Sequence, residues 1–440
     1  MRDALGLEIS TNDAAAVAAV DQFRFELGAL GAGIGAIMPA ADAHPDQAYL
    51  QSCAASLCLY GQCAEADGGA DVYLARARAA SAGANARERA FLATLEDWRR
   101  RRYEDAIAKL EALVAEWPRD LIAVKALEFL YFVRGQHYSG PRFLKTMQGV
   151  ERANTDSGHF LAVLSFAQQL SGRYDEALGT AERATALEPD NSWAHHTMAH
   201  AFLKTGAIER GAAVLEGQRP VWDAAGQVMH SHNYWHLALM YLEQRQGDKA
   251  LGFLDAPIMA DMPHIMVQLV DAASLLWRLE MAGFPVAPAR WAALADEVTP
   301  YAGQCYTAFN SAHLVYALAR AGRDAELADA LAALDGGIAT LGPDEQAVWR
   351  EVGLELLRGC IAFARDRHAD AAALLGPLMG PARESVVRVG GSDAQVDLFR
   401  QAYLCALIGA GEKSAARAYL DRISTSPTAT PLRDYWHARC

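Results

Sequence analysis

Arg173-Tyr-Asp-Glu-Ala-Leu178 opens a segment that closes with Leu187-Glu-Pro189, and it is the clearest architectural signal in this 440-residue chain. A near copy, Arg102-Tyr-Glu-Asp-Ala-Ile107 followed by Glu116-Trp-Pro118, lies 71 residues earlier, close to two periods of about 34–35 residues. Each copy reads as a turn, a helix with small alanine contacts and a proline that ends the helix. The sequence therefore predicts a repeat of helices.

The segment after Pro189 predicts the first helix of the next repeat. Asp190, Asn191 or Ser192 is expected to cap its start, because short polar side chains accept hydrogen bonds from the first backbone N–H groups. Gly206 is expected to end this helix, since glycine adopts the left-handed conformation of a helix C-terminus. Two helices in one period of this length are the pattern of a tetratricopeptide repeat.

The repeat extends beyond these copies in weaker form. The clearest repeats span about 87–255, and degenerate repeats cover about 30–86 and 256–425. Further second helices are expected to begin near Asp248, His368 and Glu412. We therefore expect an all-α fold, a right-handed tetratricopeptide-like solenoid that forms a single domain over 1–440. The degeneracy of the repeats favours a curled, closed form.

Composition and charge limit the kinds of partner. Hydrophobic residues make up 52% of the chain and the formal net charge is −13, which opposes binding to a phosphate backbone. The basic run Trp98-Arg-Arg-Arg-Arg102 is too short to reverse this and is predicted to be a solvated face. No apolar stretch is long enough to span a bilayer, and the start of the chain lacks a signal-peptide profile. We expect a cytoplasmic protein without nucleic-acid or membrane partners.

Six of the 13 histidines lie between residues 195 and 236. His196 and His200 are four residues apart, as are His232 and His236, so each pair shares one face of a helix. The two pairs are 36 residues apart, about one repeat, which places them on neighbouring first helices whose axes lie roughly 8–10 Å apart. First helices line the concave surface of such arrays, where the four imidazoles are expected to converge. His195 and His230 are interpreted as bystanders.

Three interpretations of this cluster remain open. Imidazole is a common ligand of zinc, iron, copper and nickel, so two facing pairs could hold a metal, with Asp271 as the nearest carboxylate. Alternatively, the histidines with Asn233, Tyr234 and Trp235 form a polar pocket that binds an anionic or aromatic ligand or transfers protons. In the third interpretation, these side chains fill a helix interface and hydrogen-bond to nearby carbonyl groups.

At these residues the chain resembles the tetratricopeptide repeat protein 38 family, and the resemblance covers nearly the whole chain. The matching stretches are Trp193-x-x-His196-Thr-x-Ala-His200, His232-Asn-Tyr-Trp-His236, Asp271-x-x-Ser274-x-Leu276-x-Arg278-Leu279, Phe309-Asn310-x-Ala312-His313 and Gly390-Gly391-Ser392-x-Ala394-Gln395-x-Asp397-x-Phe399. The resemblance implies an α-helical solenoid and no particular activity. It also implies a set of recurring polar residues, namely His196, His200, His232, Asn233, His236, Asp271, Arg278, Asn310 and His313.

Three of these residues are candidate catalytic groups. His313 is a candidate acid or base, although it lies about two repeats after His236 and would join the cluster only in a tightly curled chain. Asp271 and Arg278 share a helix face, where they either serve the site or pair with each other or with a neighbouring helix. The segment Gly390-Gly-Ser-Asp393 precedes a helix and fits either an ordinary turn with an N-cap or an anion site.

The leading hypothesis is a histidine-rich pocket on the concave face that binds a small polar molecule or a peptide. Its candidate binding residues are His196, His200, His232, Asn233, His236, Trp193, Tyr234 and Asn310. The alternative is an enzyme that uses a divalent metal (Zn, Fe, Mn or Cu) held by His196, His200, His232 and His236. The second alternative is a scaffold for protein–protein interaction. Whether the protein is an enzyme, and whether it forms a homodimer, stay open.

Overall fold

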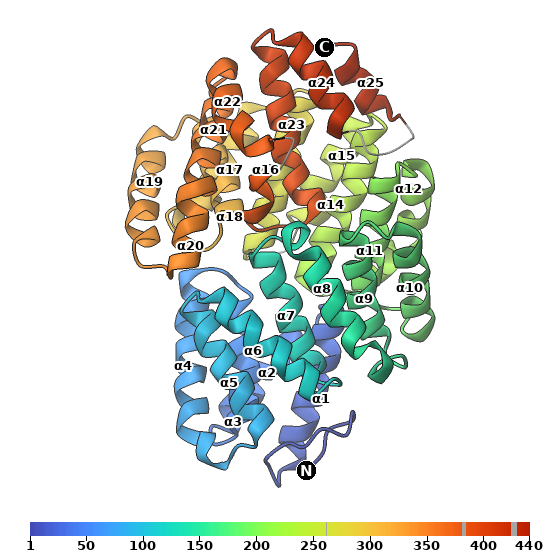
Figure 1. The fold of residues 1–440 in the computed structure, drawn as a ribbon, viewed down its shortest axis with the longest axis vertical. Coiled ribbons are helices and arrows are strands. Elements are labelled where there is room, and N and C mark those ends of the chain that lie inside the picture. The colour runs from blue at the N-terminus through green and yellow to red at the C-terminus, as the bar shows by residue number, and fades with distance from the viewer. Residues whose placement is uncertain (261, 381–383, 424–428) are drawn as a thin grey trace. The chain divides into compact units, whose positions relative to one another are not determined.

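The computed structural model describes residues 1–260, 262–380, 384–423 and 429–440. These residues form α-helices joined by short turns and single turns of 3-10 or π-helix (Figure 1). They contain no β-strand beyond the two isolated bridges Arg2–Glu8 and Gly31–Ala225. The all-α prediction is confirmed.

The helices belong to two compact units whose segments interleave along the chain. Unit 1 comprises Met1–Val133, Ser139–Thr197 and Pro220–Met229, and unit 2 comprises Arg134–Tyr138, Met198–Arg219 and His230–Cys440. The division passes through helix α11 (Ser192–Thr205), which carries the first histidine pair. The expectation that this helical solenoid forms a single domain over 1–440 stays a prediction.

Unit 1 is built from antiparallel helix pairs, of which α3 with α4, α5 with α6 and α9 with α10 pack closely (Figure 1). Its helices are α1 (Ala14–Ala29), α2 (Ile37–Ala43), α3 (Ala48–Leu59), α4 (Ala64–Ala80), α5 (Ala86–Arg99), α6 (Tyr103–Glu116), α7 (Leu121–Val133), most of α8 (Gln136–Val150), α9 (Gly158–Leu170) and α10 (Tyr174–Leu187). Helices α6 and α10 begin at the tyrosines of the two repeated motifs, as predicted.

Unit 2 continues the same helix pairing, with α17 against α18 and α21 against α22. Its helices are the end of α11, α12 (Ile208–Glu216), most of α14 (Gln227–Glu243), α15 (Gly247–Phe253), α16 (Met266–Met281), α17 (Pro288–Ala302), α18 (Ala308–Arg320), α19 (Asp324–Ile338), α20 (Pro343–Val348), α21 (Leu354–Ala364), α22 (His368–Leu375), α23 (Asp393–Gly409), α24 (Lys413–Ile423) and α25 (Pro431–His437). Short α13 (Arg219–Asp223) lies at the division. Helices α15, α22 and α24 begin within one residue of the predicted starts near 248, 368 and 412.

One turn recurs between the two helices of a repeat. At each occurrence a residue with left-handed φ ends the first helix, and the next N–H donates to the carbonyl group five residues earlier, at 2.8–3.1 Å. This is the 6→1 hydrogen bond of the Schellman motif, which satisfies a helix-end carbonyl locally. The left-handed residues are Arg101, Gly172, Gly206, Arg245, Gly283, Gly322, Asp366 and Gly411. Gly206 and the cap at Asn191, whose Oδ1 accepts a hydrogen bond from Ala194 N, confirm the predicted limits of α11.

Substitutions at two glycines of unit 1 allow the backbone effect of this turn on stability to be measured without side-chain crowding. Gly172 has φ +77°, Gly179 lies inside α10, and neither would bring a Cβ within 4 Å of another described side chain or backbone segment. Gly172→Ala is therefore expected to lower the free energy of unfolding by about 1–2 kcal/mol, the cost of a left-handed Cβ. Gly179→Ala should raise it by about 0.5–1 kcal/mol. Chemical denaturation of both variants checks this, and a change of the same sign in both would contradict it.

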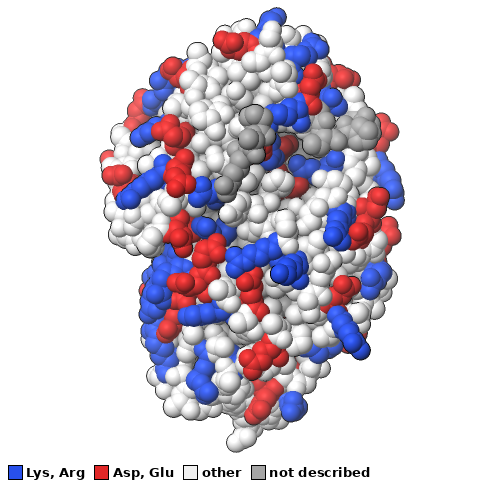
Figure 2. All heavy atoms as spheres, viewed as in Figure 1, with Lys and Arg blue, Asp and Glu red and all other residues white. Residues whose placement is uncertain are grey.

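Basic and acidic side chains are interspersed over the face shown in Figure 2. Arginines of the basic run at 98–102 follow this pattern within unit 1. Arg99 pairs with Asp71 at 2.8 Å, Arg101 pairs with Asp67 at 3.0 Å, and Arg102 pairs with Asp97. Neighbouring aspartates thus offset the charge of the run. No helix in the described ranges combines the length and hydropathy that crossing a bilayer requires.

Candidate functional site

Four helices of unit 2 carry a layer of buried polar side chains, and its first pair joins α11 to α23. His200 Nδ1 lies 2.9 Å from Oδ1 of Asp393, the first residue of α23. Ser392 and Gln395 form a capping box at this helix start, which fixes the position of Asp393 and confirms that the segment after Gly390 is a turn with an N-cap. Burial lowers the pKa of His200. Burial also raises the pKa of Asp393, but Lys204 and His200 outweigh it and hold that pKa well below its ordinary value.

The second histidine–aspartate pair joins α14 to α16. His232 Nδ1 lies 2.8 Å from Oδ2 of Asp271. Asp271 is fully buried, and burial raises the pKa of its carboxyl group although His232 acts in the opposite direction. Oδ1 of Asp271 accepts no hydrogen bond from the described residues. Trp235 stacks on His232 with ring centroids 5.1 Å apart. The stacking and the hydrogen bond to Asp271 together fix the orientation of the imidazole ring.

His236 lies between these two pairs. Its ring centroid is 4.5 Å from that of His200 and 4.8 Å from that of His232, and its side chain has no exposed surface. The histidine layer of unit 2 is defined here as His200, His232, His236, Asp271 and Asp393. It brings together three of the four histidines that the sequence singled out.

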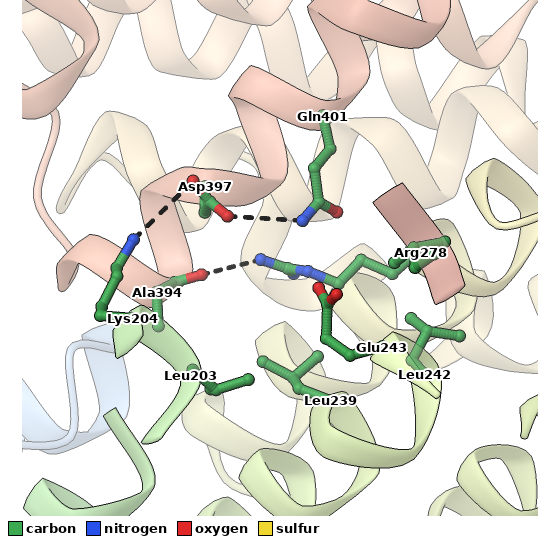
Figure 3. Close-up of a pocket in the computed structure, with 10 residues that line it drawn as sticks. Leu203, Lys204, Leu239, Leu242, Glu243, Arg278, Ala394, Asp397 and Gln401 are labelled. Carbon is green, nitrogen blue, oxygen red and sulfur yellow. Dashed lines mark hydrogen bonds and ion pairs between the residues drawn. The ribbon is translucent and has the colours of Figure 1, made fainter. Parts of the chain in front are cut away.

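A pocket lies one to two helical turns further along the same four helices, and α25 also contributes a residue to it (Figure 3). Each of the four helices contributes a residue three to eight positions after its member of the histidine layer. The lining residues are Leu203, Lys204, Leu239, Leu242, Glu243, Arg278, Ala394, Asp397, Gln401 and Leu432. The cavity volume is about 60 Å³, enough for roughly four water-sized groups. The pocket therefore suits a small molecule or the end of a larger one.

Arg278 is the most buried cationic group of this pocket. Its side chain is 3% exposed, its Nη2 donates to Ala394 O at 2.8 Å, and its Nη1 donates to Ser274 Oγ. Among the described residues, no carboxylate oxygen lies within 4.0 Å of a guanidinium nitrogen of Arg278, the distance limit of an ion pair. Burial lowers the pKa of Arg278 to about 10, and Asp397 and Asp271 oppose that shift. Within the described part of the chain, this cation in the pocket wall thus has no paired anion.

The remaining charged groups of the pocket mix both signs. Burial raises the pKa of Glu243 to about 7, and its Oε2 accepts a hydrogen bond from Thr430 Oγ1 at 2.6 Å. Burial also raises the pKa of Asp397, but Lys204 and Arg400 outweigh burial and keep it below its ordinary value. Lys204 Nζ lies 3.9 Å from Asp397 Oδ1 and 3.8 Å from Asp393 Oδ2. This lysine thus contacts both the pocket, where Figure 3 shows its ion pair with Asp397, and Asp393 of the histidine layer.

Two of the predicted binding residues, Trp193 and His196, lie in unit 1. Their rings stack with centroids 4.3 Å apart. Trp193 Nε1 donates to Glu128 Oε1 at 3.0 Å, and the buried Lys125 lies over the Trp193 ring at 4.0 Å and pairs with Glu128 at 2.6 Å. This aromatic and ionic cluster is part of the core of unit 1. The four-histidine metal set is divided between the units, and it stays a prediction.

Tyr234 lies on a different face of α14 from the histidine pair. Its hydroxyl accepts a hydrogen bond from Arg219 Nε at 3.2 Å, and its ring packs against Phe253 of α15 with centroids 5.6 Å apart. Asn233, the preceding residue, is also buried. Tyr234 is therefore directed toward the second helix of its own repeat, while His232 and His236 are directed toward the first helices of other repeats.

His313 and Asn310 lie on α18, which packs against α16. His313 Nδ1 donates to Phe309 O at 2.8 Å, and burial lowers the pKa of the imidazole to about 3. Its ring centroid is 5.6 Å from that of Phe399 on α23. Asn310 is buried in the first turn of α18, where its N–H donates to Thr307 Oγ1. The catalytic role of His313 stays a prediction, with the imidazole held neutral.

Sequence reasoning did not assign four polar residues that complete this region: Asp393, Lys204, Glu243 and Asp397. A usable signal was present, because Lys204 follows His200 by four residues and Asp397 follows Asp393 by four. Asp393 was visible only as part of a helix start. Its pairing with His200 joins residues 193 positions apart, and helix periodicity does not encode such a contact.

Comparison with known families supports the repeat itself. Residues 169–220 match the family model of the tetratricopeptide repeat. This range covers α10, α11 and α12, the segment in which the sequence motif is clearest. The chain is therefore of the tetratricopeptide-repeat type, a class of helical solenoid that presents surfaces for protein interaction.

Proposed function

We propose that this protein, which resembles the tetratricopeptide repeat protein 38 family, binds a small carboxylate-bearing molecule in the pocket of unit 2. Arg278 carries the proposal. A guanidinium in an apolar environment normally pairs with an anion, because leaving a charge buried and uncompensated costs several kcal/mol. Arg278 is buried, lies in a pocket wall and has no ion-pair partner among the described residues. A bound anion would supply that partner.

The hydrogen-bonding capacity of the pocket fits this ligand. A guanidinium has five N–H donors, and two of those of Arg278 are directed to Ser274 and Ala394. The others are available for the two oxygens of a carboxylate, which match the planar fork of arginine. Leu203, Leu239 and Leu242 form an apolar side of the pocket for a short hydrocarbon part of the ligand (Figure 3).

The size of the pocket suits a small ligand or the end of a larger one, and does not suit an extended peptide lying within it. A space of about 60 Å³ holds a carboxylate and a few carbon atoms but not several residues of a peptide. The interaction-scaffold role of the repeat class does not conflict with this proposal, because partner proteins bind extended surfaces and not a space of this size. The second candidate function is a metal-dependent enzyme. The two buried histidine–aspartate pairs favour it, and binding of a metal is its first requirement.

Titration with matched acids and amides tests the carboxylate site. The probes are acetate and isobutyrate, with acetamide and isobutyramide as uncharged counterparts, followed by calorimetry or ligand-observed NMR on the full chain. We expect isobutyrate to bind at least about tenfold more tightly than its amide, a difference of about 1.4 kcal/mol. Arg278→Gln should remove that preference, because glutamine keeps hydrogen-bonding capacity but not the charge.

Arg290→Gln is the matched control. Arg290 also lies in unit 2, but it is partly exposed and already pairs with Asp255 at Oδ1 and Oδ2. This variant should bind isobutyrate with the affinity of the unmodified protein. Equal binding of acid and amide, no binding of either acid, or unchanged affinity in a folded Arg278→Gln protein would each reject the proposal.

A further inference from the structure

The orientation of the histidine layer distinguishes it from an ordinary buried polar network. His200 and His232 each direct Nδ1 to a buried aspartate, so Nε2 is on the far side of each ring from its carboxylate. The third imidazole, His236, lies beside both rings. Histidines that ligate a metal characteristically engage a carboxylate or carbonyl group through the other ring nitrogen, which fixes the ring and raises its basicity. Two such pairs occur here within one layer.

We propose that His200, His232 and His236 bind a divalent transition metal, with zinc as the preferred ion, and that Asp393 and Asp271 are the outer-shell carboxylates. This proposal does not rest on the carboxylate site of the neighbouring pocket. Neutral imidazole suits zinc, and three protein nitrogens leave a fourth tetrahedral position for water or another donor. The ligand set spans α11 and α14, and its supporting carboxylates come from α16 and α23.

The three rings of the layer adjoin one another through His236. Zinc–nitrogen bonds of 2.0–2.1 Å place two ligating nitrogens about 3.4 Å apart in a tetrahedral site. A ring nitrogen of His232 lies within 4.8 Å of one of His236, and the ring centroids of His200 and His236 are 4.5 Å apart. The nitrogens of His232 and His236 would therefore have to approach one another by up to about 1.4 Å to reach ligand spacing.

Charge provides an independent reason for a cation in this layer. Asp271 is fully buried, and among the described residues its ion-pair partner is His232, with no lysine or arginine nitrogen within 4.0 Å. Its Oδ1 is buried without a hydrogen bond from those residues. A buried carboxylate needs a compensating positive charge, because an uncompensated buried charge is strongly unfavourable. A divalent ion on Nε2 of His232 would compensate it through the imidazole.

Zinc titration of metal-free protein tests the site directly. The full chain is purified, dialysed against a chelator, returned to chelator-free buffer and titrated with zinc chloride, with bound metal measured by elemental analysis. We expect one zinc per chain. His200→Ala and His236→Ala should each weaken binding by more than the roughly 10–100-fold that loss of an outer-shell partner costs, and Asp271→Asn should weaken it within that range.

His230→Ala is the matched control, because His230 lies on α14 two residues before His232 and outside the layer. It should retain full zinc affinity. Arg278→Gln should also retain zinc while losing the preference for carboxylates, which separates failure of this proposal from failure of the proposed function. If a histidine variant does not fold by circular dichroism, cobalt(II) bound to the unmodified protein should show the intense visible bands of tetrahedral nitrogen coordination.

Two results would overturn the metal site. One is zinc uptake far below one equivalent by the unmodified protein, together with no tetrahedral cobalt spectrum. The other is zinc affinity in folded His200→Ala and His236→Ala proteins equal to that of the unmodified chain. Either would assign the layer to a hydrogen-bonded network that fills the helix interface.

Discussion

Replacing Glu128 by leucine is expected to lower the free energy of unfolding by about 3–5 kcal/mol, because the change leaves Lys125 buried without its carboxylate. Both side chains are buried in unit 1, at 5% and 3% exposure, and their charged atoms are 2.6 Å apart. Glu128 also accepts the hydrogen bond of Trp193 Nε1, which would lose its acceptor. Chemical denaturation monitored by tryptophan fluorescence measures the loss.

Two further variants make this result interpretable. The double variant Lys125→Met/Glu128→Leu removes both charges and should recover most of the lost stability, since apolar replacements of a whole buried pair are often neutral. Glu176→Leu is the exposed control: Arg173 and Glu176 have the same three-residue spacing in the same unit but lie at the surface. Its effect should stay within about 0.5 kcal/mol. A loss below about 1 kcal/mol in Glu128→Leu would show that Lys125 escapes to water.

The second large effect is a pH dependence that originates at Glu243. Burial raises its pKa from an ordinary value near 4.5 to about 7. The folded state therefore binds a proton over a range in which the unfolded chain has released it, so stability falls as the pH rises from about 4.5 to 7. The groups that face Glu243 are Thr430, Asp397, Arg278 and Lys204. A shift of this size corresponds to about 2–3 kcal/mol, with allowance for partial exposure.

Glu243→Gln isolates this contribution. Glutamine keeps the shape and an acceptor for Thr430 but does not titrate in this range. Denaturation curves at pH 5 and pH 8 should show that the variant loses about 2–3 kcal/mol less than the unmodified protein over this interval. Other titrating groups, including the histidines, affect both proteins equally and cancel in the comparison. Parallel pH profiles would mean that Glu243 is ionised throughout.

Much of the fold could be predicted because its information is local. The repeated Arg-Tyr motif and the prolines mark the second helices, and Asn191 and Gly206 mark the two ends of α11. Each of these signals acts through hydrogen bonds within a few residues, so the sequence contains the whole cause. Arg101, Arg245 and Asp366 adopt the same left-handed turn without being glycine, and only the neighbouring helices reveal that role.

The site could be predicted only in part, because its contacts join distant helices. Spacing placed His232 and His236 on one helix face, and Asp271, named from the sequence as the nearest carboxylate, lies 2.8 Å from His232. Asp271 contacts His232, and its helix neighbour Arg278 instead donates to Ser274 and Ala394. Side-chain packing across the whole unit decides which helix faces meet. The periodicity of a single helix does not predict this choice.

Lys204 interacts with one aspartate of the histidine layer and with one aspartate of the pocket in unit 2. Its ammonium group lies at nearly equal distances from Asp393, which supports His200, and from Asp397, which lines the pocket. A ligand that draws this ammonium toward the pocket withdraws positive charge from Asp393. If metal and carboxylate both bind, thermodynamic linkage then requires each to change the affinity of the other by the same factor, and Lys204→Met should bring that factor close to one.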